Sequence, residues 1–280
     1  MRDRHVVRLC VLAWAVSCLS AAPIRAAAAG LSFVEPLAAP LVFARDANNN
    51  GPYGPDSAYG IAKGDFNGDG KLDLAVTASQ AAARPAPDQA FIYVMLGNGD
   101  GRFQPPGALP IPLLNGSRAQ VYGILAKDFD QDTMVDLLTV SPELQEVLFF
   151  KGHGDGTFAL PVATTTTGRP VAVQAADLDG DDILDVVTLN SFNQTQIEVF
   201  IGNGNGTFHA PSQHTVNSGQ SDLLIADFNH DDAPDLFVAS ADTPSAYILL
   251  NDGHRRFSGG GDRTATLEQA DHRRVRGEVR

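Results

Sequence analysis

A two-part signature occurs four times along this 280-residue chain, and this repetition constrains the fold more than any other feature. The first part is an acidic stretch that continues into apolar residues: DFNGDGKLDLAV from Asp65, DFDQDTMVDLLTV from Asp128, DLDGDDILDVVTL from Asp177 and DFNHDDAPDLFVA from Asp227. The second part is an apolar run followed by a glycine-rich turn that ends in phenylalanine: GDGRF, GDGTF, GNGTF and a degraded GHRRF. The acidic stretches start 63, 49 and 50 residues apart, a period typical of solenoids and propellers.

Each unit of about fifty residues is interpreted as four short strands, with the acidic loop between the first two and the glycine-rich turn before the last. The second and third strands are almost continuously apolar, which indicates that both faces of each small sheet are covered. The chain also has 27 Asp, 6 Glu, 27 Gly and 17 Pro, a composition that favours turns over long helices. We therefore predict an all-β fold: a β-propeller or partial propeller of about four four-stranded blades, whose repeats start near residues 59, 120, 171 and 221. A β-sandwich with chance acidic turns is the alternative.

The pairing of a DxxGDGxxD-type loop with G-x-F-x-x-P turns resembles the FG-GAP or VCBS repeat proteins, whose relatives include the integrin α-chain propellers. The resemblance covers about Leu31 to Phe257. It implies a calcium-binding β-propeller with the calcium loops in the hairpins between the first two strands of each blade. It implies no particular ligand or activity, because one fold hosts many functions.

The acidic loops have the ligand chemistry that calcium requires. A hard divalent cation takes six to eight oxygen ligands, and carboxylate and amide oxygens favour Ca²⁺ over zinc or copper. In a nine-residue loop, these oxygens come from side chains at positions one, three, five and nine and from the backbone carbonyl at position seven. Position by position, the predicted side-chain ligands are Asp65, Asn67, Asp69, Asp73; Asp128, Asp130, Asp132, Asp136; Asp177, Asp179, Asp181, Asp185; and Asp227, Asn229, Asp231, Asp235. The predicted carbonyl ligands belong to Lys71, Met134, Ile183 and Ala233.

Two other interpretations of these loops are weaker. An EF-hand needs a glutamate at position twelve, where the four copies have Val76, Thr139, Thr188 and Val238. Asx turns without metal explain one carboxylate per loop but not three or four, which would repel one another if no cation were present.

Position six of the loop requires a residue that tolerates positive φ, and the β-branched Thr133 is the poorest residue there. About four Ca²⁺ sites are expected, and the second is the doubtful one. The stretch DANNNG from Asp46 is interpreted as a polar loop.

The N-terminal residues 1–29 have the pattern of a secretory signal peptide. Arg2, Arg4 and Arg8 precede an apolar stretch at residues 9–19 that is too short to span a bilayer, and cleavage after Ala22 or Ala28 is expected. Residues 15–17 are a poor context for a lipid on Cys18. A secreted, extracellular or periplasmic location follows, with the propeller at residues 30–260 and a charged, solvated tail at 261–280. The net charge of −13 excludes a nucleic-acid partner, and no transmembrane segment is expected.

No sequence pattern of a hydrolase is present: the chain after residue 29 lacks G-x-S-x-G, H-E-x-x-H and cysteine, so no enzymatic activity is expected. We expect instead a binding or adhesion module for an extracellular protein or glycan, which uses the variable loops opposite the calcium loops, above all residues 78–90. A calcium-dependent lectin or an accessory domain of a carbohydrate-active enzyme is the alternative.

Two architectures of the propeller stay open. The ring of blades closes if residues 31–40 complete the last blade; otherwise an open propeller would pair with another copy.

Overall fold

The computed structural model describes residues 57–80, 89–111, 120–191, 196–216, 220–240, 245–254, 256–258 and 265–266. Within these ranges the chain forms strands and no helix, which confirms the all-β prediction. The predicted signal peptide, residues 31–40, the polar loop from Asp46 and residues 81–88 lie outside the described residues. No helix in the described part of the chain is long and apolar enough to cross a membrane.

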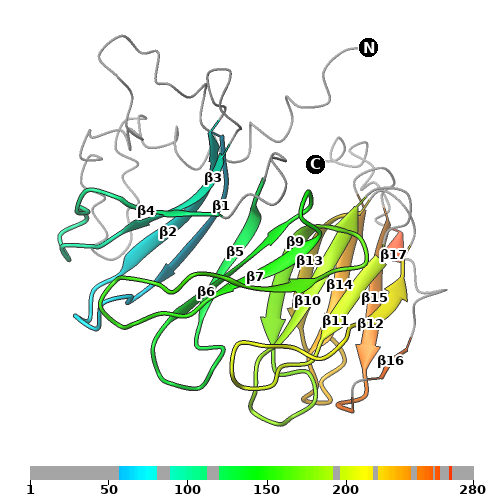
Figure 1. The fold of residues 1–280 in the computed structure, drawn as a ribbon. Coiled ribbons are helices and arrows are strands. Elements are labelled where there is room, and N and C mark those ends of the chain that lie inside the picture. Colours follow the sequence, from blue (N-terminus) through cyan, green and yellow to red (C-terminus); the bar gives the residue numbers. More distant parts are fainter. Residues whose placement is uncertain are drawn as a thin grey trace, which may run out of the picture. The chain divides into compact units, whose positions relative to one another are not determined.

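The strands form four antiparallel sheets in chain order, as predicted (Figure 1). The first sheet contains β1 (Ser57–Gly64), β2 (Asp73–Gln80), β3 (Gln89–Met95) and β4 (Gly107–Pro110). The second contains β5 (Tyr122–Lys127), β6 (Asp136–Ser141), β7 (Glu146–Phe150) and β8 (Val162–Thr165). The third contains β9 (Arg169–Ala176), β10 (Asp185–Ser191), β11 (Gln196–Phe200) and β12 (Ser212–Thr215). The fourth contains β13 (Gln220–Ala226), β14 (Asp235–Ser240) and β15 (Ser245–Asn251), with β16 (Phe257–Ser258) and β17 (Ala265–Thr266) both paired to β15.

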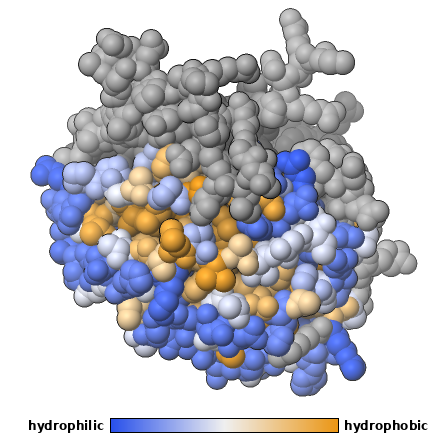
Figure 2. All heavy atoms as spheres, viewed as in Figure 1, coloured by the Kyte–Doolittle hydropathy of each residue, from blue (hydrophilic) through white to orange (hydrophobic). Residues whose placement is uncertain are grey.

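Each pair of consecutive sheets encloses one hydrophobic core. Ile92 and Leu148 belong to the core between the first and second sheets, Leu138 and Phe200 to the next core, and Leu189 and Leu236 to the last. This stacking explains why the second and third strands of each unit are apolar on both faces. Among the described strands, the first and fourth sheets do not contact each other. In the view of Figure 2, apolar residues also reach the surface near the middle of the described part, with hydrophilic residues at the sides and below them.

In the first three sheets, the outer strand begins later than the sequence suggested. The phenylalanine of the glycine-rich turn makes only an isolated bridge there, such as Gly152 with Phe158, and the outer strand starts four residues further on. In the fourth sheet, Phe257 begins β16. Proline immediately precedes β4, β8 and β12 (Pro106, Pro161 and Pro211). Because proline lacks the N–H that a ladder requires, it delays the start of these strands.

The fourth sheet is completed by a segment that we assigned to the tail. Ala265 pairs with Ala246 and Thr266 with Ser245, at the end of β15 that corresponds to the outer-strand position in the other sheets. These two residues therefore pair with β15, within the segment 261–280 that we expected to be a charged, solvated tail. Two-residue strands carry almost no apolar pattern, so the sequence gives no signal for them.

Candidate functional site

The acidic loops join the first and second strands of every sheet, as predicted, and their backbone turns tightly. Position six has positive φ in all four copies, at Gly70, Thr133, Asp182 and Asp232. Thr133 adopts a φ of 72° although it is β-branched, so the second loop is strained where we expected resistance. Position four is also left-handed, at Gly68, Gln131, Gly180 and His230. We did not predict this second left-handed position, although the glycines at 68 and 180 were a signal for it.

The carboxylate at position one folds each loop around itself. One of its oxygens accepts a hydrogen bond from the N–H of position six: Asp65 from Gly70 at 2.8 Å, Asp128 from Thr133 at 2.8 Å, Asp177 from Asp182 at 2.8 Å and Asp227 from Asp232 at 3.1 Å. The position-five carboxylate accepts in the same way from the N–H of position seven, for example Asp181 from Ile183 at 2.9 Å. These contacts hold the acidic side chains around the inside of the turn.

The aspartate at position nine has a structural role that the sequence analysis missed. Asp73, Asp136, Asp185 and Asp235 are fully buried. In Asp185, Oδ2 accepts from the N–H of Leu178 in its own loop at 3.0 Å, and Oδ1 accepts from the N–H of Gly202 in the glycine-rich turn at 2.9 Å. The same pair of bonds occurs in the other three copies, where the turn residue is Gly97, Gly152 or Asn251. This aspartate therefore ties the acidic loop to the turn, and both lie at the same edge of the sheet.

Carboxylates from positions one, three and nine converge in two of the loops. Oxygens of Asp128, Asp130 and Asp136 lie within 4.8 Å of one another, and so do those of Asp177, Asp179 and Asp185. In the first and fourth loops, position three has an amide oxygen in place of a carboxylate, from Asn67 and Asn229. The donor set is oxygen throughout, and Oδ1 of Asp130 is buried without a hydrogen-bond partner. These residues fit a hard cation such as Ca²⁺. The predicted carbonyl ligands at position seven stay predictions.

Two of the buried aspartates, Asp136 and Asp185, are poorly stabilised as anions. The pKa of each is raised to about 6, chiefly by burial; the neighbouring carboxylates of positions three and five also raise it, and the two backbone N–H groups lower it. A cation beside each group would offset both the burial and the repulsion. The electrostatics thus favour a bound positive charge beside Asp136 and Asp185.

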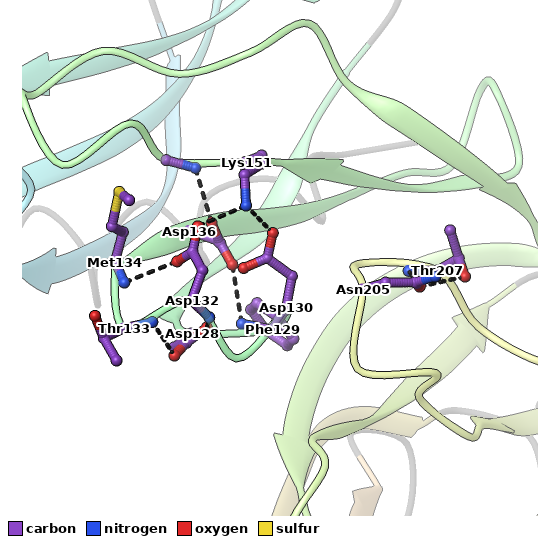
Figure 3. A network of polar contacts seen from close by, with 11 residues as sticks. Asp128, Phe129, Asp130, Asp132, Thr133, Met134, Asp136, Lys151, Asn205 and Thr207 are labelled. Atoms are coloured by element: carbon purple, nitrogen blue, oxygen red, sulfur yellow. Dashed lines mark hydrogen bonds and ion pairs between the residues drawn. The ribbon is translucent and has the colours of Figure 1, made fainter.

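The second loop already has a positive charge of its own. The ammonium group of Lys151 contacts Asp130, and it lies 2.5 Å from Oδ2 of Asp132 (Figure 3). Both hydrogen bonds raise the pKa of Lys151. The equivalent residue before the turn is apolar in the other repeats: Leu96, Ile201 and Leu250. In the first loop, the ammonium group of Lys71 lies 2.9 Å from Oδ2 of Asp69, and this ion pair is exposed to solvent. The lone lysine in VLFFKG was the sequence signal for this contact, and we did not use it.

One of the variable loops at the opposite edge links two sheets. Glu143, between β6 and β7, accepts from Nη2 of Arg169 on β9 at 2.8 Å and from the N–H of Gln120 at 3.1 Å. This part of the predicted binding edge therefore also joins the second and third sheets. Residues 81–88, 192–195 and 241–244 of the other variable loops lie outside the described residues.

Repeated four-stranded sheets, with acidic loops and glycine-rich turns at one edge, define a propeller-type repeat protein. The sequence matches the FG-GAP-like repeat family over residues 65–139, 128–188 and 184–238. These segments span more than half of the chain, and the chain belongs to this family.

No curated protein matches the sequence. Two similar solved structures are rhamnogalacturonan lyases. The chain is 16% identical to the Bacillus licheniformis lyase PL11, with a TM-score of 0.47, and the match covers 74% of this chain and 44% of that one. It is 13% identical to the lyase YesW, with a TM-score of 0.44, and the match covers 71% of this chain and 42% of that one. The chain therefore spans less than half the length of either lyase.

Proposed function

We propose that this chain is an exported, calcium-stabilised propeller module that binds an extracellular protein or glycan and has no catalytic role. The observation that carries the proposal is the shared construction of the four acidic loops. In every copy, a buried aspartate at position nine ties the loop to the glycine-rich turn, and the other acidic and amide side chains surround the same turn of backbone.

Calcium has a structural role in this proposal. The position-nine carboxylate joins two connections of one sheet, so a cation bound to it stabilises the loop, the turn and the strands that they connect. The first, third and fourth loops are the calcium sites. The second loop binds calcium weakly, because Lys151 competes for Asp130 and Asp132 and because Thr133 has a strained backbone. A cation that enters this loop would have to displace the ammonium group.

The hydrogen bonds that the loop carboxylates already accept support a binding role over a catalytic one. In the third loop, for example, the aspartates at positions one, five and nine accept hydrogen bonds from backbone N–H groups, and a cation would use their remaining lone pairs. They are therefore not arranged as a free acid and base. The calcium edge has short loops of similar construction, whereas the opposite edge has loops of different length and composition. Variable loops on a rigid scaffold are the usual place for ligand recognition.

Calcium stoichiometry, measured by isothermal titration calorimetry on the full chain, tests the metal sites. We expect about three ions per chain, about two for Asp181→Ala and about four for Lys151→Leu, because leucine restores the apolar residue found at this position in the first and fourth repeats. Asp222→Ala is the matched control: this exposed aspartate lies on β13, away from the loops, and its loss should leave the count unchanged. A wild-type chain that binds no calcium would refute the metal sites.

The binding role needs a separate test, because the scaffold could hold calcium without binding a partner. The purified chain would be applied to a glycan array and to an array of extracellular proteins, in calcium and again in chelator. We expect a ligand that is retained in calcium and released in chelator, since loss of the metal loosens the scaffold that positions the loops. The absence of any ligand on both arrays would contradict a binding module.

A further inference from the structure

The three internal contacts between consecutive sheets are built in the same way. In the first three acidic loops, the residue at position two is a large apolar side chain that packs against the next repeat: Phe66, Phe129 and Leu178 are only 1–2% exposed. Phe66 meets Phe158 of the next glycine-rich turn edge-on, at 5.6 Å between ring centroids. The carbonyl of Phe66 also accepts from the N–H of Gly156 in that turn at 2.8 Å. The contact thus joins an acidic loop to the glycine-rich turn of the following repeat.

The other two internal contacts repeat this chemistry. Phe129 shares a core with Phe208 of the third repeat's turn. Leu178 shares a core with Phe257 of the fourth repeat, and its carbonyl accepts from Nδ2 of Asn251 at 2.7 Å. Each contact therefore has two halves: an apolar side chain at position two of one repeat, and a phenylalanine turn of the next.

The fourth repeat exposes the first half of such a contact. Phe228, at position two of its loop, is 39% exposed. Leu224, on β13 beside this loop, is 52% exposed, whereas its equivalent Leu125 packs into the core between the second and third sheets. These side chains have the pattern of an internal contact, but no fifth sheet is present among the described residues to cover them.

The first repeat exposes the other half. Ile61, Leu72 and Phe103 are 59%, 62% and 36% exposed. Their equivalents in the second repeat (Ile124, Val135 and Phe158) all pack into the core shared with the first sheet. Five of the eight large apolar side chains that are exposed in the described part lie at these two ends, where the described residues provide no neighbouring sheet. Exposed apolar groups gathered in this way mark interaction surfaces.

We propose that a second copy of this chain covers these ends, so that the Phe228 face of one copy binds the Phe103 turn of the next. Each copy carries both halves of a contact that occurs three times within the chain, and the first and fourth sheets do not meet among the described strands. Val76, Tyr93 and Met95 on the same face of the first sheet are already buried, so the contact uses the part of that face around Ile61, Leu72 and Phe103. A head-to-tail contact of this kind gives closed rings or open chains of copies.

Sedimentation velocity over a range of protein concentrations, in excess calcium, tests the proposal with the full chain. We expect the wild type to associate as concentration rises. Leu224→Glu and Ile61→Glu each place a charge in one half of the contact and should weaken self-association about tenfold or more. Leu160→Glu is the control, because Leu160 is 80% exposed and belongs to neither half.

The decisive experiment mixes the Leu224→Glu and Ile61→Glu variants. Leu224→Glu keeps an intact first-repeat end and Ile61→Glu an intact fourth-repeat end. At a concentration where each variant alone is monomeric and the wild type associates, an equimolar mixture should therefore form a one-to-one dimer. A monomeric wild type, as expected if the ends close within one chain, overturns the proposal. Self-association of either single variant at wild-type strength, or a mixture that stays monomeric, also overturns it. Melting curves check that the variants fold, and Phe228→Gln with Phe103→Gln provides a second pair without added charge.

Discussion

Removal of calcium with a chelator is expected to lower the melting temperature of this protein by about 15–25 °C. At a calcium concentration about 100 times the Kd, each site contributes about 2.7 kcal/mol to the free energy of unfolding, and three sites contribute about 8 kcal/mol. The effect is large because each cation would offset the burial of a position-nine aspartate and the repulsion among its neighbours. Calorimetric melting of the full chain, with chelator and after excess calcium is restored, gives the measurement. Identical melting curves would show that calcium is not a folding ligand.

The same experiment has a pH dependence whose sign follows from the raised pKa values. Asp136 and Asp185 have a pKa of about 6 in the metal-free fold, against the ordinary 3.8 in the unfolded chain. Without metal, the folded chain binds more protons than the unfolded chain between these values, so the contribution of both groups to stability falls as pH rises from about 4 to 6. Calcium must displace these protons. The increase in melting temperature caused by calcium should therefore be larger at pH 7.5 than at pH 5.

Replacement of the buried aspartate in the third loop, Asp185→Ala, is expected to destabilise the fold even in chelator. The change leaves the N–H groups of Leu178 and Gly202 without their acceptor, and each unsatisfied buried group costs about 1–3 kcal/mol. The expected decrease in melting temperature is on the order of 10 °C.

Asp181→Ala is the matched comparison for this prediction. Asp181 belongs to the same loop and is a predicted calcium ligand, but its hydrogen bond to the N–H of Ile183 is exposed. In chelator, Asp181→Ala should therefore melt close to the wild type, whereas in calcium both variants should lose stability. Equal melting temperatures of the two variants in chelator would show that position nine acts only through the metal.

Much of the fold and of the candidate site could be predicted because the signals are local. The acidic or amide residues at positions one, three, five and nine and the strand on either side of the loop lie within about 20 to 24 residues, and the pattern recurs four times. The positive φ at position six also followed from the tightness of a nine-residue loop. The structure confirms these features, including the strain at Thr133, because turn geometry and strand formation depend mainly on neighbours in sequence.

The remaining features depend on which segments meet in space. Asp185 binds Gly202 across the sheet, and Lys151 reaches Asp130 from a different strand connection, so neither contact can be read from the loop alone. The completion of the fourth sheet by Ala265 and Thr266 depends on a strand too short to have a pattern. Equivalent positions of the repeats also differ in exposure: Phe66 is buried and Phe228 is exposed, because Phe66 packs against a following sheet and Phe228 has none among the described residues. The sequence by itself thus determined the repeat, its strands and its acidic loops through local periodicity. The tertiary structure decided the partner of each buried carboxylate and which apolar faces stay uncovered, because burial is set by neighbours that are distant along the chain.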